Sequence, residues 1–200
     1  FPGDTGAAYP VGGLVQDAVG NIYGVTANGG EDDLGTVFKL TTAGVLERLH
    51  SFTGIAPDGA RPAGGLVLDG DGYLYGTTEE GGAHGFGTIF RLSTVGGLPV
   101  TLHSFNGTDG MTPLAALIRD ADGNLYGTTR EGGAYNFGRL FKWTSSGEFV
   151  SLHDFNGSDG AYPEAALVRD ADGTLYGTTS SGFGAAAFGT VFKRSSGGEL

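Results

Sequence analysis

Aspartate residues recur at fixed positions along this chain, at a spacing that could bind a cation. The phrase Asp-x-Asp-Gly begins at Asp69, Asp120 and Asp170, and a looser copy begins at Asp17. Closely spaced carboxylates can open a calcium loop, but such a loop needs about six or more oxygen ligands, usually with a later bidentate carboxylate. Here an apolar, β-rich run follows the turn at once. We therefore predict hairpin turns and no bound metal.

Three histidines, His50, His103 and His153, stand in a recurring phrase in which leucine precedes the histidine and phenylalanine follows two residues later. Three imidazoles could bind zinc if they met at one point. We expect them instead on the outermost strands of successive units, where they point to different places. Each shares a strand face with the following phenylalanine, so we predict structural histidines with hydrogen-bond partners.

Acidic residues between predicted strands, Glu79, Glu80 and Glu131, could serve acid or base catalysis. The chain nevertheless has no nucleophile elbow, no His-Glu-x-x-His motif and no framed pair of carboxylates. Its glycine-rich loops do not precede helices, so they lack the helix N-terminus that binds phosphate. We predict a non-enzymatic protein that requires no cofactor.

The elements that must position these residues follow a repeat of about 50 residues. The repeated tyrosines Tyr23, Tyr75, Tyr126 and Tyr176 are 52, 51 and 50 residues apart. A period of this length with strand signals throughout indicates propeller blades, whereas helical repeats would require a helical periodicity that is absent. We predict a single all-β repeat domain over residues 1–200, a β-propeller-like array of four four-stranded blades, with repeats at 1–51, 52–104, 105–154 and 155–200.

Each repeat contains the same four strand candidates. The first is short and is entered through small residues, as at 13–16, 65–68, 116–119 and 166–169, which suits crowded backbones near a propeller axis. The second is the Leu-Tyr-Gly-Thr-Thr run, and the third spans 36–40, 88–92, 139–143 or 190–194. The fourth spans 45–52, 99–105 or 149–155, and the last repeat lacks it.

Alternation along the third strand predicts the interior. Four phenylalanines share one face of this strand, and we expect them to form the core between blades with the first-strand leucines and the repeated tyrosines. The predicted core residues are Phe38, Phe90, Phe141 and Phe192, with Leu14, Leu66, Leu117 and Leu167.

Composition excludes several classes of partner. The formal net charge of −11 disfavours nucleic acid, because a phosphate backbone is bound through clustered Lys and Arg. No apolar run approaches the roughly 20 residues of a membrane span. The chain has no cysteine, which excludes disulfides and thiolate metal sites but leaves an extracellular location open.

A binding surface is predicted where the repeats differ most. Loops between second and third strands, and connections from one blade to the next, should emerge on one face of a propeller, and a rigid scaffold with variable loops is how binding surfaces are built. Neutral drift in loops is the alternative. The predicted ligand-binding face, for a carbohydrate or a protein, comprises Glu79, Glu80, His84, Phe86, Arg130, Tyr135, Asn136, Phe137 and Phe183.

The phrases LYGTT, FGTVFK, LHSF and DGDGYLYGTT together resemble the GloVer tandem-repeat family of bacterial proteins. The resemblance spans the whole chain. It implies export, an extracellular or cell-surface location, a propeller-like all-β fold and an unassigned function. Repeat one departs from the pattern at Val19, and repeat four departs from it over residues 180–187.

From these observations we expect a binding or structural-assembly module. The alternative is a propeller hydrolase or lyase that acts on extracellular polysaccharide through Glu79, Glu80 and Glu131. The missing last strand also predicts self-association through the first and last repeats, because unpaired strand edges and uncapped repeats invite pairing. A ring closed within one chain and a segment of a longer array remain open.

Overall fold

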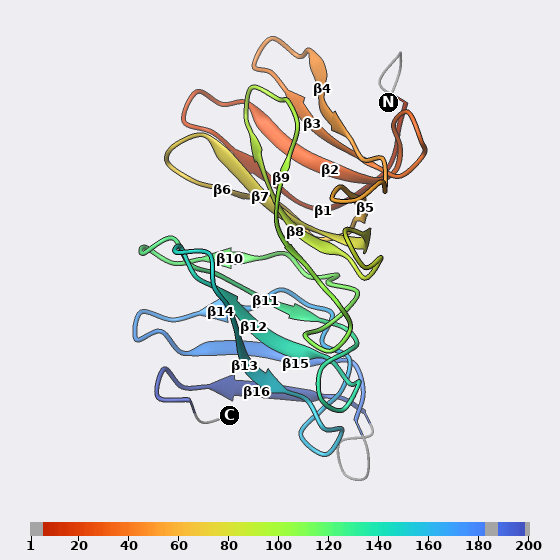
Figure 1. The fold of residues 1–200 in the computed structure, drawn as a ribbon. Coiled ribbons are helices and arrows are strands. Elements are labelled where there is room, and N and C mark those ends of the chain that lie inside the picture. The colour runs from red at the N-terminus through yellow and green to blue at the C-terminus, as the bar shows by residue number, and fades with distance from the viewer. Residues whose placement is uncertain (1–5, 183–187, 199–200) are drawn as a thin grey trace.

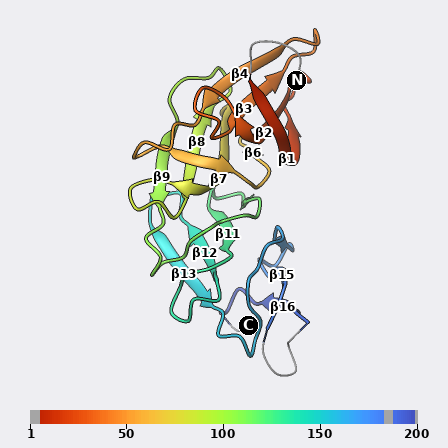
Figure 2. The ribbon, with the colours of Figure 1, turned by 90° about the vertical axis from the view of Figure 1, so that its right-hand side faces the viewer.

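The computed structural model describes residues 6–182 and 188–198, and over these ranges the protein is an all-β array of four small antiparallel sheets (Figure 1). In two perpendicular views the sheets follow one another from the N-terminal to the C-terminal end, and the two termini lie at opposite ends of the array (Figure 2). We call the sheets blades 1 to 4. The described part contains no helix of the length and hydrophobicity that crossing a bilayer requires.

Each blade lies within one predicted repeat. Blade 1 is β1–β2–β3–β4, and blade 3 is β10–β11–β12–β13. In blade 2 the order is β5–β7–β8–β9, with β6 also paired to β7, and blade 4 is β14–β15–β16. The strands are β1 Ala7–Gln16, β2 Ile22–Gly29, β3 Thr36–Leu40, β4 Leu46–Ser51, β5 Gly59–Pro62, β6 Val67–Leu68, β7 Tyr73–Gly81, β8 Thr88–Ser93, β9 Val100–Ser104, β10 Ile118–Arg119, β11 Leu125–Thr129, β12 Arg139–Trp143, β13 Phe149–Asp154, β14 Val168–Arg169, β15 Leu175–Thr179 and β16 Thr190–Arg194.

The first strands differ from the prediction. In blades 2, 3 and 4 the regular strand shrinks to two residues (β6, β10 and β14), whereas β1 is longer and irregular between Val11 and Val15. Close approach of neighbouring backbones explains the interruption: a Cβ at Gly64 would lie 2.5 Å from the carbonyl oxygen of Ala115. The small residues at this position therefore do allow adjacent blades to crowd together, as expected near a propeller axis.

The core lies between blades, where the phenylalanine that follows one blade packs on the third strand of the next. The ring centroids of Phe52 and Phe90 are 5.2 Å apart, and the two equivalent pairs, Phe105 with Phe141 and Phe155 with Phe192, are separated by 5.4 and 5.1 Å. All six rings are buried, which confirms the predicted strand phase.

The two outer faces of the array are uncovered. Val37, Ile89 and Leu140 are fully buried against the following blade, but the equivalent Val191 of blade 4 is 82% exposed. At the other end, the equivalents of Leu14 are buried in blades 2 to 4, whereas Leu14 itself is 62% exposed. The prediction that Leu14 belongs to the core is therefore wrong for the described residues, in which no other blade packs against this side of blade 1.

Candidate functional site

The predicted loop face exists, because loops and blade connections meet there through backbone hydrogen bonds. The amide of Thr112, in the connection from blade 2 to blade 3, donates to the carbonyl oxygen of Phe86 in the β7–β8 loop at 3.1 Å. The amide of Arg130, which follows β11, donates back to Thr112 at 3.0 Å. Tyr162 makes the same two contacts with Phe137 and Ser180 at the next junction. Each connection is thus tied to the loop before it and the strand after it.

One residue in every repeat of this face adopts a left-handed backbone that the sequence did not reveal. Tyr9, Arg61, Thr112 and Tyr162 have φ between 55° and 57°, and each precedes a proline. This conformation is unusual for residues other than glycine, and most of all for a β-branched threonine. It directs the amides of Thr112 and Tyr162 toward carbonyl oxygens of the preceding blade. The hydrogen bond between blades thus offsets the backbone strain of this conformation. The only sequence signal is the recurring x-Pro step.

The structure distributes the predicted ligand-binding residues over two successive loops. His84 and Phe86 are exposed in the loop after β7, and Tyr135 and Asn136 are exposed in the loop after β11. Phe137 is half-buried and packs near the ring of Tyr162, with centroids 5.9 Å apart. Asn136 has a left-handed φ of 61°, and its Oδ1 accepts the amide of Gly132 at 3.2 Å. Their role in ligand binding stays a prediction, and Phe183 lies outside the described residues.

Glu79 and Glu80 were expected in a loop, but they lie in β7, which continues to Gly81. The strand is longer than predicted because β5 pairs with its end, placing Ala60 opposite Glu80. The carboxylate of Glu80 is 3.6 Å from the guanidinium of Arg61. These two acids therefore belong to the paired end of β7 and do not lie in a free loop.

Arg130 is held by two carboxylates. Its Nε donates to Glu164 at 2.8 Å, and a second guanidinium nitrogen contacts Glu131. The hydrogen bond that Arg130 donates to Glu164, which burial opposes only in part, raises the pKa of Arg130 above its ordinary value. The guanidinium carbon also lies 5.2 Å from the ring centroid of Tyr162. These contacts tie the end of β11 to the connection between blades 3 and 4.

The repeated histidines are structural, as predicted. His50, His103 and His153 each place Nε2 within 3.3 Å of an aspartate in the next connection, at Asp58, Asp109 and Asp159. Burial alone would raise the pKa of Asp58 and of Asp109, but hydrogen bonds from the histidine and from backbone amides outweigh it and lower both values. Each pair therefore fastens the end of one blade to the next connection.

The Asp-x-Asp-Gly turns are hairpins, and both carboxylate oxygens of their first aspartate accept hydrogen bonds. Oδ1 of Asp120 accepts the amides of Asp122 and Asn124, and Oδ2 accepts the hydroxyl of Tyr126 at 3.0 Å. In the first repeat, burial alone would raise the pKa of Asp17, but hydrogen bonds from Asn21, Tyr23 and backbone amides lower it to about 2. Burial and the hydrogen bond to Asp17 raise the pKa of Tyr23 to about 12. Among the described residues no three His, Asp or Glu side chains lie close enough to hold a metal ion.

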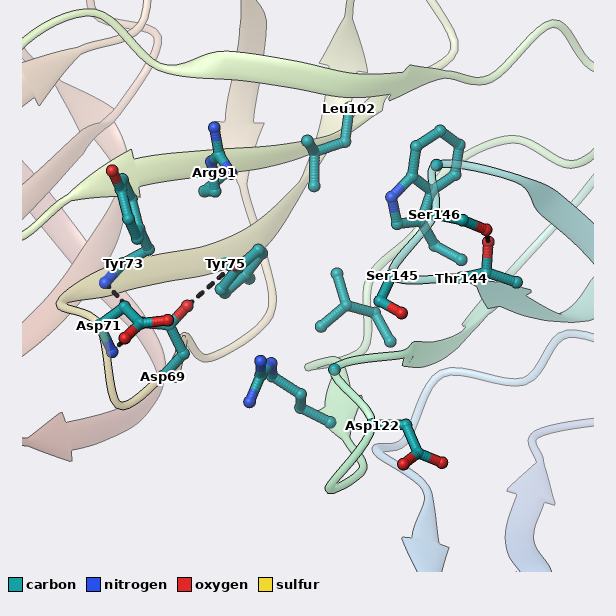
Figure 3. Close-up of a pocket in the computed structure, with 15 residues that line it drawn as sticks. Asp69, Asp71, Tyr73, Tyr75, Arg91, Leu102, Asp122, Thr144, Ser145 and Ser146 are labelled. Atoms are coloured by element: carbon teal, nitrogen blue, oxygen red, sulfur yellow. Dashed lines mark hydrogen bonds between the residues drawn. The ribbon is translucent and has the colours of Figure 1, made fainter.

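A cavity that sequence reasoning missed lies between blades 2 and 3, beside these hairpin turns and away from the loop face (Figure 3). Its volume is about 380 Å³. Blade 2 contributes Asp69, Asp71, Tyr73, Tyr75, Arg91 and Leu102, and blade 3 contributes Arg119, Asp122, Gly123, Leu125 and 143–147. The lining residues come from different repeats, so no contiguous motif announces the cavity.

Comparison with known proteins decides the family. The model of the Gloeobacter/Verrucomicrobia repeat matches residues 1–199. The chain belongs to this family. The match to the Gloeobacter/Verrucomicrobia repeat thus confirms the resemblance seen in the sequence, and it covers all four blades. No curated protein matches the chain.

Solved structures similar to this member of the Gloeobacter/Verrucomicrobia repeat family confirm the propeller fold. Virginiamycin B lyase from Staphylococcus aureus is 17% identical with a TM-score of 0.60, covering 99% of this chain and 55% of that one. A nidogen/laminin complex is 17% identical with a TM-score of 0.62, covering 93% of this chain and 64% of that one. The extracellular domain of a putative hybrid two-component system from B. thetaiotaomicron is 15% identical with a TM-score of 0.58, covering 92% of this chain and 21% of that one. The chain spans 55% of the length of virginiamycin B lyase and 64% of the matched chain of the nidogen/laminin complex.

Proposed function

We propose that the chain is a non-enzymatic assembly module, whose first and last blades each stack against another blade of the same repeat. In the 200-residue chain, that blade belongs to a second copy. The observation that supports this proposal is the exposure of Val191 and Leu14 at positions that are buried in every internal junction. We place the protein outside the cell or at its surface, supported by the likeness to an extracellular domain.

The internal junctions show which partner fits these faces. Leu140 of blade 3, the equivalent of Val191, packs with Leu167 and Phe192 of blade 4. Leu167 is in turn the equivalent of Leu14, so the face of blade 4 is complementary to the face of blade 1. Burying a valine or leucine contributes about 1.5–3 kcal/mol each, which favours covering both ends.

Such a contact is head-to-tail and therefore forms either a ring or a filament. The comparisons also support a partner, because the four blades match only 55% of the length of virginiamycin B lyase. The exposed edge of β16, which has no fourth strand beside it in the described residues, adds backbone groups that another strand can pair with.

The alternative, a polysaccharide hydrolase or lyase, is the weaker proposal. Two carboxylates at a catalytic spacing of about 5 to 9.5 Å in one pocket would favour it. Of its candidate acids, Glu80 lies beside Arg61 and Glu131 contacts Arg130. Both carboxylates are therefore already engaged by an arginine, which weakens this alternative.

Sedimentation of paired variants tests the assembly. The parent, of 20.3 kDa, should sediment as a dimer or larger species at micromolar concentration, and Val191→Asp and Leu14→Asp should each be monomeric. An equimolar mixture of the two variants should restore a dimer, because one intact face remains on each. Val95→Asp, on an exposed hairpin turn away from both faces, is the matched control and should assemble like the parent.

Two results would contradict the proposal. A parent that stays monomeric shows that the uncovered faces do not associate. If Val191→Asp is monomeric while Leu14→Asp still dimerises, two copies meet through the same face of blade 4, and the head-to-tail arrangement is wrong.

A further inference from the structure

The cavity between blades 2 and 3 differs from the other blade junctions in its aromatic residues. Tyr73 stands where the other repeats have Asn21, Asn124 and Thr174, and Trp143 stands where they have Leu40, Leu92 and Arg194. Tyr73 is 37% exposed, and Trp143 is half-buried. The corresponding hollow between blades 1 and 2 is lined by Asp17, Ala18, Val19, 68–70, Gly72 and Thr94, without an aromatic ring or an arginine.

Two arginines in this cavity have unused hydrogen-bond donors. Neither guanidinium, of Arg91 or of Arg119, forms a hydrogen bond or an ion pair with a residue that the structure describes. Arg91 lies over the ring of Tyr73 at 4.7 Å from its centroid, and Arg119 lies 6.0 Å from that of Tyr75. On the loop face, by contrast, Arg130 is ion-paired. The cavity thus keeps charged donors beside aromatic rings.

Acceptors are also present. Oδ1 of Asp69 accepts the amides of Asp71 and Tyr73, and its Oδ2 accepts the hydroxyl of Tyr75, so this carboxylate has no free oxygen (Figure 3). The carboxylates of Asp71 and Asp122 are exposed and accept no hydrogen bond from the described residues. Together with Asp69, three carboxylates therefore face two guanidinium groups in the lining of the cavity.

We propose that this cavity binds uncharged sugar units of a glycan. A sugar ring offers apolar C–H faces that pack on Tyr73 and Trp143, and hydroxyls that both donate and accept, which matches the mixture of Arg91, Arg119, Asp71 and Asp122. A cavity of about 380 Å³ lies within the range of ligand sites, where a few polar groups orient a ligand against apolar walls. The excess of carboxylates over guanidinium groups in the lining and the net charge of −11 disfavour a polyanion.

The site is independent of the proposed assembly, because it lies between the two inner blades and uses neither Leu14 nor Val191. Association of chains and sugar binding can therefore fail separately. Binding of sugar by the monomeric Val191→Asp variant would show this directly.

Trp143 is the only tryptophan of the chain, so its fluorescence reports on this cavity alone. Cellohexaose, xylohexaose and mannohexaose are titrated into the full 200-residue chain, with oligogalacturonate as the charged comparison. At least one uncharged hexaose should produce a saturable change. Tyr73→Ala and Arg119→Ala should each weaken its binding about tenfold. Tyr135→Ala, which truncates an exposed ring on the predicted ligand-binding loop face, tests the competing location of the site.

Three outcomes overturn the proposal. No saturable change with any of the three hexaoses removes the uncharged glycan as ligand. Tighter binding of oligogalacturonate shows that the arginines select an acidic sugar. Binding that survives Tyr73→Ala and Arg119→Ala but is lost in Tyr135→Ala, as followed by calorimetry, moves the site to the loop face. The melting temperatures of all three variants are measured in parallel so that unfolding is not mistaken for loss of binding.

Discussion

Truncating Phe141 to alanine tests the packing between blades most directly. The ring is fully buried at the junction of blades 2 and 3, with the centroids of Phe105 and of Phe149 each 5.4 Å away. Removing it leaves a cavity that the two neighbouring rings cannot fill, because Phe105 is held in the connection that follows β9 and Phe149 is held in β13. The expected loss of unfolding free energy is about 3–5 kcal/mol.

For a chain of this size each kcal/mol lowers the melting temperature by about 2–4 °C, so Phe141→Ala should melt roughly 6 to 20 °C below the parent. Differential scanning calorimetry and urea unfolding measure the effect. Phe188→Ala is the matched control, because that ring is 99% exposed and its loss should change stability by less than about 0.5 kcal/mol. If Phe141→Ala melts with the parent, the assignment of this face to the interior is wrong.

Three further predictions concern the polar contacts of the repeat. The pKa of Asp109, which is paired with His103, is lowered in the folded protein. The stability that this adds is present above the ordinary pKa of about 4 and is lost as pH falls through the lowered pKa. The melting temperature of Asp109→Asn should therefore depend less on pH between about 2 and 5 than that of the parent. Tyr126→Phe removes a donor to the Asp120 carboxylate and should cost about 1.5–3 kcal/mol in urea unfolding; an unchanged midpoint would show that water replaces the hydroxyl. Calcium should not raise the melting temperature, and a saturable rise that disappears in Asp122→Ala would reverse this reading.

The sequence predicted the parts of the fold that repeat and missed those that depend on neighbours. Alternation around Phe90 and Phe141 located the third strands and the core, because a strand with one buried face must alternate. Leu14 has the same sequence context as Leu66, yet its environment differs since no other blade packs against it in the described residues. Thr112 was missed because a β-branched residue before proline rarely takes a left-handed backbone.

The candidate sites divide in the same way. Local phrases were enough to predict the histidine contacts and the hairpin turns, because their partners lie within a few residues. The cavity joins Tyr73 to Trp143, which are 70 residues apart and become neighbours only when two blades stack. Their distinctive character was visible in the sequence as departures from the repeat. Their proximity was not, because it depends on the registration of one sheet against the next.

Phe52, Phe105 and Phe155 each follow the last strand of one blade but complete the core of the next blade. Each internal junction therefore uses the same pair of phenylalanines, one from the connection and one from the third strand that follows it. Inserting or removing one whole repeat preserves this pairing at every remaining junction, so such an array can change its length in steps of one blade without redesigning an interface. The same arrangement couples the stability of adjacent blades, because the ring that completes the core of one blade is positioned by the last strand of the blade before it.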